Sequence, residues 1–85
     1  QTDLTLHSPN DGTRMGVLKA ADILTGESIT LRYWHGHSGK YHQVTLTTEH
    51  FDNLKSNSPV VLTIPTTVLD GHFHVLVIDP KKTVP

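Results

Sequence analysis

Cysteine is absent from this 85-residue chain, so no disulfide, thiolate zinc site or iron–sulfur cluster can stabilise the fold. Aromatic residues are few, at 6 %, and seven Lys and Arg against eight Asp and Glu leave a formal charge of −1. A charge this small produces no long-range field that would recruit nucleic acid or an anionic membrane. No apolar run approaches the roughly 20 residues of a membrane-spanning helix. We therefore expect one small domain with a modest core.

Enzyme signatures are missing as well. The sequence contains no G-x-S-x-G, Walker A or G-x-G-x-x-G motif, and Ser38 lies near histidines without a placed acid to complete a triad. His35 and His37 have the H-x-H spacing of cupins, but the glutamate of the cupin motif does not follow them. We expect a protein that is not an enzyme, with metal-assisted hydrolysis or oxidation at an open histidine site as the alternative.

Histidine is the residue in excess, with seven in the chain, about 8 % and several times its share in a generic domain. The chain also begins at Gln1 and not at methionine, which is typical of a processed or trimmed product. Removal of a signal peptide is one explanation, and we expect a periplasmic or secreted protein on that ground.

The hydrophobic pattern predicts an α+β fold, mainly antiparallel β, in which a small curled sheet, barrel or sandwich carries two short helices. We expect helices over 19–25, ended by Gly26, and over 49–56, capped by Thr47 or Thr48. Strands are predicted at 2–7, 15–18, 29–37, 41–46, 60–64 and 72–78, the last of them central because both its faces are apolar. Residues 1–79 are expected to form a single domain, and residues 80–85 a C-terminal tail.

The two halves of the chain resemble each other, with repeat units at about 16–46 and 44–78. The segment 22–31 aligns with 52–62, which matches Leu31 with Leu62. Each half then reaches a Gly-His pair and a further histidine, His42 or His74, that is followed by alternating aliphatic residues. A true duplication predicts a pseudo-twofold domain whose histidine-bearing turns lie at the same end.

A predicted hairpin places histidines side by side. If residues 39–40 form a two-residue turn, His37 pairs with His42, and His35 lies two residues further along the same face. Directly opposite residues have Cβ atoms about 4.5–5.5 Å apart, close enough for two imidazoles to bind one ion. His72 and His74 share a face in the last predicted strand in the same way.

We therefore predict a non-catalytic divalent-metal site whose ligands are His35, His37, His42, His72 and His74. Protonated imidazoles in one cluster repel each other, and unpaired neutral ones lose free energy in apolar surroundings, whereas a metal ion binds their lone pairs. Imidazole without thiolate favours Cu(II) first and Zn(II) second. The alternative is a structural or protein-interaction module with a hydrogen-bonded or pH-responsive histidine patch. Whether the histidines form one site or two, or a homodimer completes them, stays open, and His7 and His50 lie outside the set.

From His42 to Ile78 the chain carries an H-x-V-x-L segment, a short leucine-bearing helix and a G-H-x-H-x-L-x-I segment. This order resembles small His-rich exported bacterial domains, a resemblance that implies a cell-envelope setting and divalent metal binding. The G-H-x-H segment also resembles the tips of phage tail fibres, where histidine pairs from three chains hold iron. Those tips are repetitive, whereas this chain has enough Val, Leu and Ile to fold by itself.

Overall fold

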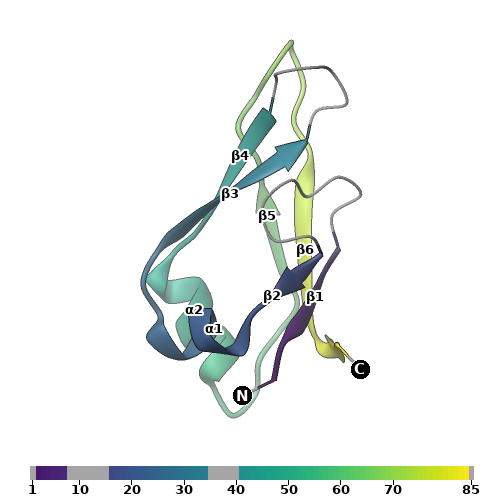
Figure 1. Cartoon of the computed structure of the whole chain (residues 1–85). Helices are drawn as coiled ribbons and strands as arrows, with labels where there is room; N and C mark the ends of the chain where they lie inside the picture. The colour runs from purple at the N-terminus through teal and green to yellow at the C-terminus, as the bar shows by residue number, and fades with distance from the viewer. Residues whose placement is uncertain (1, 8–15, 35–40, 85) are drawn as a thin grey trace.

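The computed structural model describes residues 2–7, 16–34 and 41–84, whose elements are arranged as in Figure 1. They follow the order β1 (Leu4–His7), β2 (Val17–Leu18), α1 (Ala20–Thr25), β3 (Ile29–Trp34), β4 (Tyr41–Leu46), α2 (Thr48–Lys55), β5 (Leu62–Pro65) and β6 (Val75–Thr83). One sheet has four strands in the order β2-β1-β6-β5, and the other pairs β3 with β4, all antiparallel. The predicted α+β class is confirmed, and the described strands do not close into a barrel.

The core is built from alternating strand residues and from one face of each helix. In β4, residues at even positions are buried and those at odd positions are exposed, which matches the period of a strand with one covered face. The buried apolar set is Leu4, Leu6, Leu18, Ile23, Leu31, Val44, Leu46, Phe51, Leu54, Ile64, Leu76 and Ile78. Burying each such side chain contributes about 1.5–3 kcal/mol. His42 occupies a core position of the same alternation and is fully buried.

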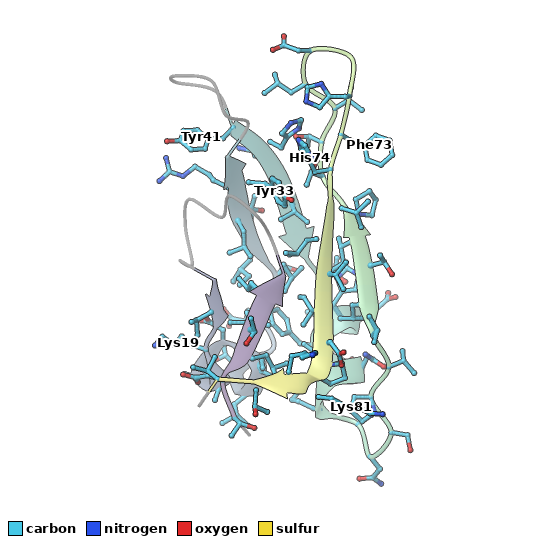
Figure 2. All side chains as sticks on the ribbon, turned by 90° about the vertical axis from the view of Figure 1, so that its right-hand side faces the viewer. Lys19, Tyr33, Tyr41, Phe73, His74 and Lys81 are labelled. Carbon is cyan, nitrogen blue, oxygen red and sulfur yellow. The ribbon has the colours of Figure 1, made fainter. Side chains whose placement is uncertain are left out.

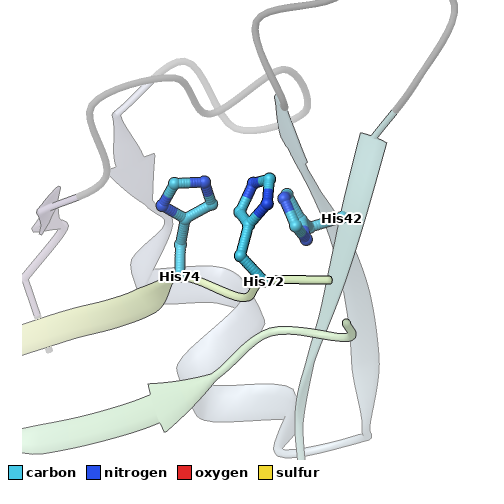
Figure 3. Close-up of side chains that lie close together, drawn as sticks. All are labelled: His42, His72 and His74. Atoms are coloured by element: carbon cyan, nitrogen blue, oxygen red, sulfur yellow. The ribbon is translucent and has the colours of Figure 1, made fainter. Parts of the chain in front are cut away.

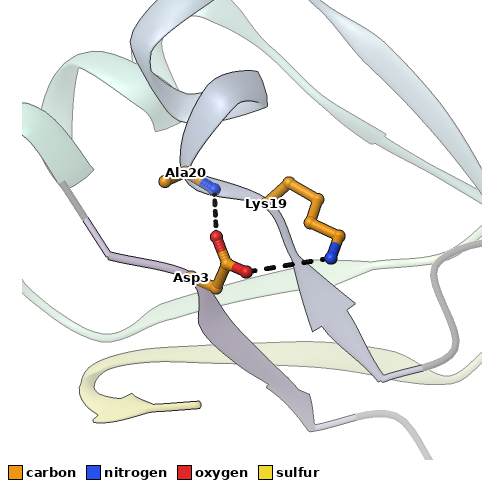
Figure 4. Close-up of polar contacts among 3 residues, drawn as sticks. All are labelled: Asp3, Lys19 and Ala20. Atoms are coloured by element: carbon orange, nitrogen blue, oxygen red, sulfur yellow. Dashed lines mark hydrogen bonds and ion pairs between the residues drawn. The ribbon is translucent and has the colours of Figure 1, made fainter. Parts of the chain in front are cut away.

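Helix α1 has no capping side chain at its own N-terminus, and the residue that precedes β1 supplies one. The residue before the helix, Lys19, makes no side-chain cap. Instead the Asp3 carboxylate accepts a hydrogen bond of 2.7 Å from the backbone N–H of Ala20, and its second oxygen lies 3.8 Å from Lys19 Nζ (Figure 4). At the other end Gly26 adopts φ 72° and ends the helix as predicted, because an αL residue favours glycine.

Helix α2 is capped locally by Thr47, one of the two residues predicted for that role. The backbone N–H of His50 donates to Thr47 Oγ1, and the backbone N–H of Thr47 donates to His50 Nδ1 at 2.9 Å. This reciprocal pair is a capping box in which histidine takes the position usual for Glu or Gln. The ring of His50 is therefore part of the helix terminus.

Strand β6 is central, between β1 and β5, as predicted, but its ends differ from the prediction. It begins at Val75 and runs to Thr83, which pairs with Leu4, whereas the strand was predicted at 72–78. The register shifts between Leu4 and Leu6, and extra residues of β6 are accommodated there. Pro80 lies in that irregular part, between the paired residues Ile78 and Thr83, and bulges are places where a strand tolerates proline.

Strand β5 begins at Leu62, two residues later than predicted. The amide side chain of Asn53 on α2 bonds the backbone of Val60, donating to its carbonyl at 3.1 Å and accepting from its N–H at 3.4 Å. The backbone of Val60 is thus satisfied by a helix side chain and not by a neighbouring strand.

The predicted hairpin register is also wrong. Tyr33 pairs with His42, and Trp34 pairs with Tyr41, and in this register His37 is not opposite His42. The shift is an even number of residues, so the faces predicted from alternation are retained. His35 and His37 lie outside the described residues.

The chain contains two helix-plus-hairpin units, α1-β3-β4 and α2-β5-β6, and their hairpins pair in equivalent registers. In the first hairpin Leu31 pairs with Val44, and in the second Ile64 pairs with Leu76. Because Val44 and Leu76 each lie two residues after the matched histidine, Leu31 corresponds to Ile64 and not to Leu62 as the sequence alignment has it. His42 and His74 therefore hold equivalent places; duplication itself stays a prediction.

We expect the remote cap on α1 to contribute to stability through its oxygen and not through its charge. Asp3→Ala should lower the free energy of unfolding by about 1 kcal/mol, because an N-terminal N–H of the helix loses its acceptor. Asp3→Asn keeps an acceptor oxygen and should retain most of that stability, since the exposed ion pair with Lys19 contributes about 0–1 kcal/mol. Urea unfolding of the two variants measures this, and equal losses would contradict the capping role.

Candidate metal centre

Three histidines from two distant strand segments lie together at one end of the molecule. His42 comes from β4, and His72 and His74 come from the segment that leads into β6 (Figure 3). One ligand atom from each residue can be chosen so that all three lie within 4.8 Å of one another. The ring centroids are 4.7 Å apart for His42 and His74, 5.1 Å for His42 and His72, and 5.3 Å for His72 and His74. This is the one metal-ligand group of three or more found among the residues that the structure describes.

The turn before β6 sets the position of His72. Asp70 and Gly71 both have positive φ, 52° and 79°, and Leu69 and His72 exchange backbone hydrogen bonds across them. Positive φ at both central residues defines a type I′ turn, for which Asp-Gly is a preferred pair. His72 is therefore fixed at the first residue of the returning strand segment.

An extra residue on the β5 side of this hairpin frees Thr67 from the ladder. Thr66 donates its N–H to the His74 carbonyl at 2.9 Å, so Thr66 lies opposite His74. Two residues separate Thr66 from Leu69, but only Phe73 separates His72 from His74. Such a bulge leaves one residue unpaired and turns its polar groups elsewhere.

Thr67 uses this freedom to join the two sheets. Its N–H donates to the Gln43 carbonyl at 2.7 Å, and its hydroxyl accepts from the Gln43 N–H at 2.9 Å. The Thr67 carbonyl accepts from His42 Nδ1 at 2.8 Å. The junction thus holds the first hairpin against the second at the level of the three imidazoles.

Hydrogen bonding determines the tautomer of two of the rings. A carbonyl oxygen can only accept, so the Nδ1 of His42 carries a hydrogen, and in the neutral ring the lone pair is on Nε2. His72 Nδ1 lies 3.3 Å from the Asp70 carbonyl oxygen, so this nitrogen is likewise the donor. Donation from one ring nitrogen to a backbone carbonyl is the arrangement that orients metal-binding histidines.

Tyr33 supports the cluster from within the core. Its ring stacks on His74 with a centroid distance of 5.1 Å and an interplanar angle of 11°, and it meets His42 edge-on at 6.4 Å. Figure 2 shows Tyr33 and His74 together, with Phe73 projecting to the other side of its strand segment. Tyr33 is buried, His42 fully so, whereas His74 is half-buried and His72 exposed.

The environment of His74 disfavours its protonated form. Burial lowers the pKa of His74, and the positive charges of His42 and His72, when protonated, lower it further. The neutral ring, which is the form that binds metal, is therefore favoured here.

The structure brings together His42, His72 and His74 of the five residues predicted as ligands. His35 and His37 lie outside the described residues, so their role stays a prediction. Sequence reasoning gave no role to Tyr33, Thr66 or Thr67. Alternation places Tyr33 on the histidine face, which is a signal for its position, but no sequence signal marks the two threonines.

Comparison with known proteins finds no matching family model, no matching curated protein and no matching solved structure. Of the G-H-x-H segment, His72 and His74 enter the cluster. In the described part of the chain, none of the helices has both the length and the apolar character needed to cross a membrane.

We expect the metal-free protein to lose stability as pH falls below the ordinary histidine pKa of about 6.5. The pKa of His74 is lowered by folding, so the unfolded chain binds this proton first as pH falls. The loss begins near pH 6.5, grows until the lowered pKa is reached, and is absent above that window. Urea unfolding in the presence of a chelator, at steps of pH, measures it. His74→Gln should reduce the slope, and an unchanged slope would contradict the assignment to His74.

Proposed function

We propose that the protein binds one divalent transition-metal ion, non-catalytically, through His42, His72 and His74. The supporting observation is the convergence of ligand atoms from three imidazoles within 4.8 Å, two of whose rings donate Nδ1–H toward backbone carbonyls. Nitrogens bound to one tetrahedral ion lie about 3.3 Å apart, given metal–nitrogen distances of about 2.0–2.1 Å. His72 is exposed and can turn about its side-chain torsions, so the set can contract onto an ion.

The ligand chemistry favours Cu(II) first and Zn(II) second. All three ligands are neutral nitrogens, which suit these ions, and divalent affinity at such sites rises to a maximum at copper. A calcium or magnesium site needs several oxygen ligands, whereas this cluster offers imidazole nitrogens alone.

Thermal unfolding of the tag-free protein with and without Cu(II) or Zn(II) at pH 7 tests the proposal. An ion that binds only the folded state at 100 Kd adds about 2.7 kcal/mol, which for a domain of this size raises Tm by about 10–20 °C. Calorimetric titration should show one ion per chain. No shift in Tm with either metal would overturn the proposal and leave a hydrogen-bonded histidine patch.

Two single substitutions locate the ion. His72→Asn removes an exposed ligand without disturbing the core and should raise the metal Kd by at least about 100-fold. Loss of an outer-shell partner of a ligand already lowers metal affinity by about 10–100-fold, and loss of a ligand should cost at least as much. His50→Gln is the matched control, because it removes a histidine while glutamine keeps an acceptor at the capping-box position. Equal metal affinity for the two variants would contradict binding at this cluster.

The double variant His35→Ala/His37→Ala tests the remaining sequence prediction. If these residues also bind the ion, the variant should weaken metal affinity as His72→Asn does. Unchanged affinity would show that the three clustered histidines suffice and that this part of the prediction is wrong.

A further inference from the structure

The described residues provide three ligands for an ion that needs at least four. The cluster contains His42, His72 and His74, and among the described residues no Asp, Glu or further histidine joins it. Structural zinc sites close the coordination sphere with four protein ligands, whereas three protein ligands leave a position for water or another molecule. Cu(II) on imidazoles likewise takes four or more ligands in a tetragonal arrangement.

The burial of the three rings differs and gives the site an inner and an outer side. His42 is fully buried in β4 and lies in edge contact with Tyr33, so the core covers the ion from that direction. His74 is stacked on Tyr33 and half-buried, while His72 at the end of the hairpin is exposed. A ligand arriving from solvent therefore meets the ion on the side of His72.

The charge of the site selects the kind of ligand. Neutral imidazoles bring no negative charge, so an ion bound by three of them keeps its full double positive charge. Partial burial strengthens the attraction between this charge and an incoming anion relative to water. A small monoanion fits both the charge and a single coordination position.

We propose that the metal-loaded protein keeps one coordination position open on the His72 side and binds a small monoanion there. This inference rests on the proposed metal binding and adds a second ligand to the same site. It assigns the protein a ternary complex of chain, metal and anion.

Azide and acetate are the probes for this position. The protein is loaded with Cu(II), freed of excess metal by gel filtration, and titrated with azide at constant ionic strength. We expect a new azide-to-copper charge-transfer absorption that saturates at one azide per copper, and a shift of the copper EPR spectrum at the same midpoint. Acetate in excess should raise that midpoint in proportion to its concentration.

The outcomes separate this inference from the metal proposal. Failure of copper to bind removes the metal proposal itself. If copper binds at one ion per chain but azide leaves both spectra unchanged, the metal proposal stands and the open position is wrong. Copper lost from the protein on azide addition, measured after a second gel filtration, also overturns the ternary complex.

Two further measurements show whether protein groups fill the fourth position. The copper-loaded His35→Ala/His37→Ala variant should bind azide as the parent does. An azide response found only in this variant would mean that the chain itself closes the site. Gel filtration of the loaded protein should give a monomer, and a copper-dependent dimer without an azide response would place the fourth ligand on a second copy.

Discussion

The contact between Thr67 and β4 is the interaction on which the candidate site depends. Its N–H and hydroxyl bond the backbone of Gln43, and its carbonyl accepts from the ring of His42. The same residue thus holds two hairpins together and orients one imidazole. Without this junction, His42 belongs to a separate two-stranded sheet, and His72 and His74 are two neighbouring histidines on another hairpin.

The site arises from a conflict between two hairpin geometries. Asp70 and Gly71 form a tight turn that fixes Leu69 opposite His72, while the β5–β6 ladder fixes Thr66 opposite His74. The two registers differ by one residue, and Thr67 is released to bond the neighbouring hairpin. A local irregularity therefore produces long-range order, as β-bulges beside functional sites do elsewhere.

Alternation and turn chemistry predicted much of this fold from the sequence. The helix boundary at Gly26, the cap at Thr47 and the buried alternation of Val44 and Leu46 follow from local rules that tertiary contacts do not override here. The pairing of Tyr33 with His42 was not predictable from alternation. Alternation fixes the face on which each residue lies, but a shift of the strand register by two or four residues leaves every face unchanged.

The same limit applies to the site. A shared face brought His42, His72 and His74 into the predicted set, but only the three-dimensional pairing of the hairpins shows that they meet. The continuation of β6 beyond Pro80 was missed because proline usually ends a strand, and the irregular pairing with β1 removes that penalty.

The location of the cluster has a kinetic consequence. Figure 1 places the connection between β5 and β6 at one end of the elongated molecule and both helices toward the other. Fraying of that hairpin tip would separate His72 from His42 while Phe51 and Leu54 stay packed at the helical end. If the cluster holds the proposed ion, exchange of that ion with its surroundings would follow the opening rate of a few residues and would not wait for global denaturation.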